Sequence, residues 1–202
     1  MIKIAVASKN AHKVKELSKM LDIDGIELVS LRELGFEGEI EEDGTTFAEN
    51  AMIKAKTVCE MYGMPAIADD SGLCVDYLGG APGIYSARYA SSDGHNSNDA
   101  ANVEKLLCEL KGVPECDRTA RFISAIAIAL PDGTERTVIG SCEGIITTEV
   151  RGNGGFGYDP VFYYVPFCKT FGETTDEEKN TVSHRFNAVR QLKKELKEIF
   201  NV

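Results

Sequence analysis

The chain has 202 residues, of which 43% are hydrophobic and 27% charged, a composition typical of globular proteins and unlike that of disordered or fibrous ones. Its formal net charge of −10, from 22 Lys and Arg against 32 Asp and Glu, argues against a nucleic-acid partner, because binding nucleic acid requires a basic surface. The longest strongly apolar stretch, residues 122–130, is far shorter than the roughly 20 residues of a membrane-spanning helix, so we expect a cytoplasmic protein without a membrane partner.

The spacing of cysteine and histidine residues gives no sign of a zinc site. The 6 cysteines, at positions 59, 74, 108, 116, 142 and 168, include no C-x-x-C pair and no other metal-ligand spacing. The 3 histidines are too few and too scattered to bind zinc together. We therefore expect reduced and mostly buried thiols, which is how free cysteine usually behaves.

The first third of the chain predicts a β-α-β unit followed by a helix. Residues 2–7 are a β-branched run, residues 14–21 have helical spacing, and residues 26–30 form a second apolar run. This order places residues 8–10 in the loop at the carboxyl end of the first strand, where α/β proteins bind ligands. Thr46 and Glu49 then form a capping-box pattern for a helix that continues to about Tyr62.

The remainder of the chain predicts further strands and two helices. Residues 66–68 indicate a buried strand that leads into Asp69, Asp70, Ser71 and Gly72. Residues 98–110 have helical spacing, and residues 183–200 predict a terminal helix. Residues 121–130 and 137–146 predict two long strands joined by a turn at 131–133, and hence an antiparallel part of a mixed sheet. The fold class is therefore α/β.

The segment from Ser8 to Lys13 is a candidate phosphate site. A loop that enters a helix presents unpaired backbone N–H groups and the positive end of the helix dipole, and Lys13 adds a full charge beside them. Ser8 and Asn10 are equally suited to be ordinary N-cap or turn residues, and the segment lacks the glycines of a P-loop. Both interpretations remain open from the sequence.

Two acidic segments are candidates for binding a divalent cation: residues 41–43, and Asp69 with Asp70 after the buried strand. Two carboxylates in such a place cost desolvation and repel each other, which a nearby cation relieves. Oxygen ligands with room for water suit Mg²⁺. Because neighbouring residues of a strand point to opposite faces, the sequence does not decide which aspartate faces the site. A solvated turn is the alternative.

Further candidates lie in the predicted helices and in a glycine-rich loop. Lys54 lies four residues after Asn50 on one helix face and could reach a phosphate, or could be an ordinary surface lysine. Phe156, in the glycine-rich loop, can stack on a nucleobase or belong to the core. His184 and Arg185 can donate to carbonyl oxygens of a base, or they can be exposed on the first helical turn after an N-cap at Ser183.

Six motifs in order resemble those of the inosine triphosphate pyrophosphatase family, which acts on non-canonical purine nucleoside triphosphates. The motifs are Ser8-Lys9-Asn10-Ala11-His12-Lys13, residues 46–51 with Lys54-Ala55, residues 69–73, residues 79–89, residues 154–160, and residues 178–180 with Ser183-His184-Arg185. The resemblance covers nearly the whole chain. It implies a single domain over residues 1–202 with an elongated mixed sheet flanked by helices, and two lobes with a central nucleotide cleft.

The resemblance also implies a homodimeric enzyme that requires Mg²⁺ and hydrolyses ITP, dITP and XTP to the monophosphate and pyrophosphate. It places the triphosphate on Ser8, Lys9, Asn10, Ala11, His12, Lys13 and Lys54, with Ser71 beside the substrate. It places the metal on Glu42 and Asp70, with Asp70 also as the general base and Glu41 as the alternative to Glu42. It places the base on Phe156, Gly157, Tyr158, Asp159, Lys179, His184 and Arg185.

Two other functions remain compatible with these residues. One is a nucleotide-binding protein without turnover, and the other is a pyrophosphatase for other modified nucleotides. The expected purine selectivity has a simple physical basis: hypoxanthine and xanthine present a carbonyl oxygen where adenine presents an amino group, and a buried donor set against that amino group is left unpaired, at about 1 to 3 kcal/mol. Release of pyrophosphate from a panel of nucleotides separates the three possibilities.

Overall fold

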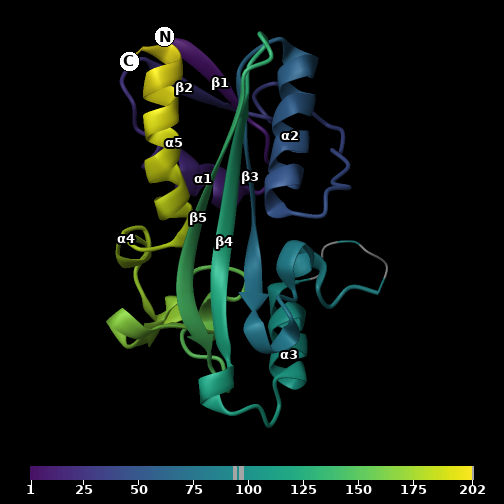
Figure 1. Cartoon of the computed structure of the whole chain (residues 1–202), viewed down its shortest axis with the longest axis vertical. Coiled ribbons are helices and arrows are strands. Elements are labelled where there is room, and N and C mark those ends of the chain that lie inside the picture. The colour runs from purple at the N-terminus through teal and green to yellow at the C-terminus, as the bar shows by residue number, and fades with distance from the viewer. Residues whose placement is uncertain (93–94, 96–97, 202) are drawn as a thin grey trace. The chain divides into compact units, whose positions relative to one another are not determined.

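The computed structural model describes residues 1–92, 95 and 98–201, and within them seven strands form one sheet in the order β2-β1-β3-β4-β5-β6-β7 (Figure 1). The strands are β1 (Ile2–Val6), β2 (Ile26–Ser30), β3 (Ala66–Val75), β4 (Thr119–Ala129), β5 (Glu135–Ile146), β6 (Phe162–Tyr164) and β7 (Lys169–Thr170). The helices are α1 (Ala11–Met20), α2 (Phe47–Tyr62), α3 (Asp99–Glu109), α4 (Asp176–Lys179) and α5 (His184–Phe200). Strand β1 is parallel to β2 and β3, whereas β6 is antiparallel to β5 and β7, which confirms a mixed α/β sheet.

The chain divides into two compact units. Unit 1 comprises residues 1–70, residues 124–140 and the segment from His184 onward, and unit 2 comprises residues 71–123 and 141–183. Strands β3, β4 and β5 each contribute residues to both units. Strand β3 leaves unit 1 directly after Asp70, so the two aspartates end its share of that unit.

The two faces of the sheet in unit 1 differ in side-chain size. Branched side chains such as Ile4, Ile67 and Ile126 pack with α1 and α5, whereas the residues between them are alanines that pack with α2. This alternation is the period of two that a strand imposes. In Figure 1, α5 (yellow) and α2 (blue) flank these strands on opposite sides. Consecutive residues of β3 face different helices. The adjacent polar residues Asp69 and Asp70 therefore contact side chains from different helices.

The ends of the helices in unit 1 follow from local sequence. Thr46 accepts from the backbone N–H of Glu49, and the Glu49 side chain accepts from the Thr46 backbone, which confirms the predicted capping box of α2. Gly63, with φ of +59°, ends this helix. A Cβ on Gly140 would lie 2.3 Å from both the Ala188 nitrogen and the His184 oxygen, so glycine is required where β5 meets the start of α5.

Unit 2 has its own core, in which three phenylalanines pack together. The ring centroid of Phe162 lies 4.5 Å from that of Phe122 and 5.1 Å from that of Phe171. Buried Arg118 donates to three backbone carbonyls, at Leu110, Ile146 and Thr147, and so joins the end of α3 to the end of β5. None of the helices among the described residues is long and apolar enough to cross a membrane.

The six cysteines are free, but the prediction that most of them are buried is wrong. Cys59 and Cys142 are buried and Cys74 is half-buried, whereas Cys108, Cys116 and Cys168 are exposed. Burial raises the pKa of Cys142 to about 12, so this thiol stays protonated at neutral pH. Cys108 lies in the last turn of α3, and Cys116 and Cys168 lie in or directly after three-residue 3₁₀ turns, where the chain runs along the surface.

Candidate functional site

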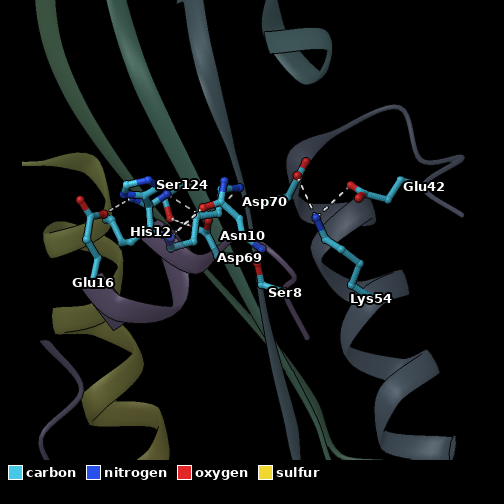
Figure 2. A network of polar contacts seen from close by, with 11 residues as sticks. Ser8, Asn10, His12, Glu16, Glu42, Lys54, Asp69, Asp70 and Ser124 are labelled. Carbon is cyan, nitrogen blue, oxygen red and sulfur yellow. Dashed lines mark hydrogen bonds and ion pairs between the residues drawn. The ribbon is translucent and has the colours of Figure 1, made fainter. Parts of the chain in front are cut away.

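Two adjacent aspartates in β3 are the centre of the candidate site. Asp69 lies on the face of α1 and α5 and Asp70 on the face of α2, and Figure 2 shows their side chains in two separate groups of contacts. Both are buried, with exposed fractions of 1% for Asp69 and 9% for Asp70. Because β3 continues through residues 69–72, the solvated-turn alternative is wrong. Cations from the neighbouring helices make this burial possible, and each aspartate has its own set of partners.

The Asp70 cluster consists of Asp70, Lys54 and Glu42. The Lys54 Nζ donates to Asp70 Oδ1 and to Glu42 Oε2, each at 2.9 Å. Lys54 is 8% exposed, so the alternative of an ordinary surface lysine is wrong. Burial by itself lowers the pKa of Lys54, but the charges of Asp70 and Glu42 outweigh it and raise that pKa above its usual value. Burial raises the pKa of Asp70, and the attraction of Lys54 and Lys13 offsets only part of that effect.

The donor set of the Asp70 cluster fits a magnesium ion. Carboxylate oxygens of Asp70 and Glu42 converge on one positive centre, the Lys54 ammonium. Among the described residues, no group of three or more His, Cys, Asp and Glu side chains could hold a metal ion. Mg²⁺ is usually bound through only one or two carboxylates, with water and substrate phosphates completing its shell. Glu42 is the residue of the acidic segment whose carboxylate contacts Lys54.

The Asp69 cluster consists of Asp69, Lys13, Arg185, Ser124 and Glu16. Asp69 Oδ2 lies 3.1 Å from the Lys13 Nζ and 3.1 Å from Arg185 Nη2, and the Ser124 hydroxyl donates to Asp69 Oδ1. Glu16 accepts from Arg185 Nη1. Burial alone would raise the pKa of Asp69, but the charges of Arg185 and Lys13 and the bond from Ser124 lower it well below its usual range. The Asp69 carboxylate is therefore fully ionised and holds two cations from different helices.

The loop before α1 is organised by Asn10. The Asn10 Oδ1 accepts from the backbone nitrogens of His12, at 3.0 Å, and Lys13, at 3.2 Å, and Asn10 is the N-cap of α1. The N-cap interpretation of Asn10 is thus confirmed, and these two N–H groups already have an acceptor. Ser8 Oγ accepts from the Asn10 nitrogen at 3.2 Å. Exposed positive charge at this loop comes from the Lys9 side chain, and the exposed Ala11 begins the helix.

The first two residues of α5, His184 and Arg185, are buried. His184 and Arg185 are 4% and 1% exposed, so the alternative that places them at the surface of the first turn is wrong. The physical reason lies in other parts of the chain: Glu16 and Asp69 compensate the charge of the Arg185 guanidinium inside unit 1. Burial by itself lowers the pKa of Arg185, but the attraction of Asp69 and Glu16 outweighs that effect. The pKa of Arg185 therefore lies above its usual value.

In unit 2, Asp159 organises the glycine-rich loop. Asp159 Oδ2 accepts from the Phe156 nitrogen at 2.8 Å and from the Lys179 Nζ at 2.7 Å. The Lys179 ammonium also lies 4.6 Å from the centroid of the Phe156 ring, a cation–π contact. A Cβ on Gly155, where φ is +72°, would lie 2.0 Å from Asp159 Oδ2, so the loop requires glycine there. Phe156 is only half-buried, and its ring is fixed on one side by Lys179.

The other predicted residues of unit 2 are also placed by named contacts. The Gly157 nitrogen donates to Asp99 at the start of α3, at 2.7 Å, and the Tyr158 hydroxyl donates to the Ser86 oxygen at 2.8 Å. Ser71 is the half-buried residue of β3 directly after Asp70. Unit 2 therefore brings together Phe156 to Asp159 with Lys179, and unit 1 brings together the lysines, the acidic residues and Arg185.

Sequence reasoning missed two members of the Asp69 cluster. Glu16 was overlooked, although its place three residues after Lys13 puts both on one face of α1. Ser124 is a single hydroxyl within the apolar run 122–130, and such an isolated polar residue in a buried strand needs a partner. Both signals existed in the sequence, but their partners are distant along the chain: Glu16 accepts from Arg185, and Ser124 donates to Asp69.

The fold and these clusters define an α/β protein whose buried lysines and acidic residues suit a phosphate-bearing ligand with a divalent cation. The sequence profile of the Ham1 family matches residues 4–195, and the chain belongs to this family. It is 52% identical to a dITP/XTP pyrophosphatase of Bacillus licheniformis, over 95% of this chain and 96% of that protein, and 49% identical to the dITP/XTP pyrophosphatase of Bacillus subtilis, over 94% of each.

Solved structures agree with this assignment. A HAM1 protein from Coxiella burnetii is 40% identical and superposes with a TM-score of 0.89, covering 98% of this chain and 100% of that chain. A protein from Mycobacterium abscessus described as a nucleoside-triphosphatase and dITP/XTP pyrophosphatase is 43% identical, with a TM-score of 0.78, and covers 95% of this chain and 98% of that chain. The α/β fold with a mixed sheet is thus shared over nearly the full length.

Proposed function

We propose that this protein is a dITP/XTP pyrophosphatase that hydrolyses dITP, ITP and XTP, with Mg²⁺, to the nucleoside monophosphate and pyrophosphate. The observation that carries the proposal is the Asp70 cluster, in which two carboxylates of a Ham1-family chain converge on one buried lysine. The full-length relatives named dITP/XTP pyrophosphatase support the choice of substrate.

In the proposed reaction, water attacks the α-phosphorus, a new P–O bond forms, and the bond from the α-phosphorus to the bridging oxygen breaks, so that pyrophosphate leaves. Asp70 accepts the proton of the attacking water, and its raised pKa makes the carboxylate a better base than an exposed aspartate. When bound at Asp70 and Glu42, Mg²⁺ supplies positive charge that stabilises the phosphoryl oxygens as their charge develops.

Two lysines are proposed to bind the phosphate chain. Lys54 is protonated and buried, so its ammonium is held in one place, where it can bind a phosphate oxygen. The Lys13 Nζ forms an ion pair with Asp69, and the Lys13 side chain is 15% exposed. Together with the loop of Ser8 to Ala11 they provide donors for the leaving pyrophosphate. Ser71 is proposed to lie beside the substrate.

The base is proposed to be recognised by the aromatic ring of Phe156, by Gly157, Tyr158 and Asp159, and by Lys179, His184 and Arg185. Asp159 and Lys179 fix the loop so that the Phe156 ring can stack on a purine. Arg185 is fixed by two carboxylates, and a guanidinium, which can only donate, favours a carbonyl oxygen of the base over an amino group. We also propose that residues 1–202 act as one functional domain, because the family profile and the full-length relatives span the residues of both units.

A single assay tests the proposed function. Pyrophosphate release is measured from dITP, XTP, GTP, ATP, dUTP and dTTP, with and without Mg²⁺. We expect rapid release from dITP and XTP, with little from the other four, and a requirement for Mg²⁺. Absence of release from every nucleotide would indicate a binding protein, and comparable rates on GTP and dITP would contradict selectivity for non-canonical purines.

The proposed assembly is a homodimer that acts in the cytoplasm, where the nucleotide pool is. We expect sedimentation equilibrium to give about twice the 22.0 kDa mass of one chain. A mass of one chain at the concentration of the activity assay would contradict the dimer without affecting the catalytic assignment.

A further inference from the structure

We propose that Asn50 is a positioning residue: it holds the acidic loop, and with it Glu42, against α2 through the backbone of Gly44, and the affinity of the enzyme for its divalent cation depends on this contact. The inference rests on the proposed function, because it takes Glu42 as a metal ligand. Asn50 itself would touch neither substrate nor metal. Its role is to keep one of the two carboxylates close to the other before the cation binds.

The contact consists of one hydrogen bond between the half-buried Gly44 backbone and the buried Asn50 side chain. The Gly44 nitrogen donates to Asn50 Oδ1 at 2.9 Å, and Asn50 is 1% exposed. Asn50 is itself fixed, because its backbone nitrogen donates to the Thr46 oxygen at 3.0 Å within the capped first turn of α2. A hydrogen bond to a rigid acceptor restricts the donor, and the buried Asn50 amide would be left without this partner if the loop moved away.

The loop approaches α2 so closely at this point that no side chain fits. A Cβ on Gly44 would lie 2.6 Å from Asn50 Oδ1 and 2.8 Å from the Glu49 Cβ. Both distances are shorter than side-chain atoms adopt, so a larger residue at position 44 must push the loop away from the helix. The glycine and the asparagine therefore form one contact, which can be broken from either side.

The same face of α2 holds the loop at a second point. Lys54 lies one helical turn after Asn50, and its Nζ donates to Glu42 Oε2 at 2.9 Å. This second contact uses a carboxylate oxygen that a metal ion would also need. The Asn50–Gly44 hydrogen bond uses no ligand atom, so it can persist when Glu42 binds a cation. It lowers the entropy lost on ordering Glu42, as supporting groups around metal ligands do.

The test is the binding of Mn²⁺ alone to the free enzyme, followed by electron paramagnetic resonance. We expect Asn50→Leu, which keeps the size of the side chain and removes the acceptor, to weaken Mn²⁺ binding by about tenfold. Gly44→Ala should weaken it similarly, by displacing the loop from the other side. Asn50→Asp keeps an oxygen acceptor for the Gly44 nitrogen and should bind Mn²⁺ at least as tightly as the native enzyme. At saturating Mg²⁺ the KM for dITP should remain unchanged in all three variants.

Two control variants separate the possible failures. Asn102→Leu removes another buried amide, one that accepts from the Ala90 nitrogen at 2.8 Å in unit 2, and should lower stability without changing Mn²⁺ affinity. Glu42→Gln removes the proposed ligand itself. If Glu42→Gln leaves Mn²⁺ affinity unchanged, the metal assignment of the proposed function is wrong. If Glu42→Gln weakens binding while Asn50→Leu and Gly44→Ala do not, the positioning role of Asn50 is overturned and the proposed function stands.

Discussion

Asp70→Asn is expected to lower the rate of pyrophosphate release from dITP by about 10³-fold or more, because one substitution removes the proposed base and one of the two proposed metal ligands. The folded state should tolerate it. Burial raises the pKa of Asp70, so the ionised carboxylate is less favourable in the folded protein than in the unfolded chain, and an amide relieves that cost. Lys54 keeps Glu42 as a partner. We therefore expect the variant to remain folded at the assay temperature, so that the loss of rate reports on the reaction.

The measurement for Asp70→Asn combines single-turnover kinetics with thermal unfolding. Asp24→Asn, an exposed aspartate of unit 1, serves as the matched control and should change neither quantity. Turnover of Asp70→Asn within tenfold of the native rate would show that the carboxylate is neither base nor essential ligand. Loss of rate accompanied by unfolding would contradict the electrostatic account of Asp70.

Arg185→Ala is expected to have the largest effect on stability, of about 3 kcal/mol or more in the free energy of unfolding. It leaves the buried Asp69 carboxylate with one cation fewer and leaves Glu16 without the guanidinium. The pKa values of the two adjacent aspartates are shifted in opposite directions. The attraction of Arg185 and Lys13 lowers the pKa of Asp69, whereas burial raises the pKa of Asp70. The preference for dITP over dATP, measured as the ratio of kcat/KM values, should fall by roughly tenfold or more.

Urea unfolding measures the stability of the Arg185 variants, and competition between dITP and dATP measures their selectivity. Arg185→Lys keeps a charge beside Asp69 without the fork geometry, so it should fold and still lose selectivity. Arg190→Ala, exposed on the same helix, is the control that should change neither quantity. An unchanged selectivity ratio in a folded Arg185→Lys variant would place recognition of the base elsewhere.

Much of the fold could be predicted because its signals are local. The first β-α-β unit, the capping box at Thr46 and Glu49, and the turn between β4 and β5 each depend on residues within one element or one turn. The length of β3 could not be predicted in this way. Asp69, Asp70, Ser71 and Gly72 favour a turn by composition, but cations from α1, α2 and α5 let the strand continue through the aspartates.

The candidate site divides in the same way. The family resemblance pointed to Lys54, Asp70 and Glu42, and the structure brings these three together. Residue spacing alone could not decide between the two aspartates, because strand alternation gives opposite faces without telling what covers each face. Burial of Arg185 was equally out of reach, since it depends on Glu16 and Asp69, which lie more than 100 positions away along the chain.

Asp70 and Glu42 are proposed to hold the divalent cation, and Lys54 is proposed to bind the phosphates. A crystal structure with Mn²⁺ and a non-hydrolysable dITP analogue, with the ion located by anomalous scattering, tests both assignments most directly. We expect oxygen atoms of both carboxylates to coordinate the ion at roughly 2.2 Å, and the Lys54 Nζ to contact a phosphate oxygen. An ion bound away from both carboxylates, with Lys54 still bridging Asp70 and Glu42, would contradict the account.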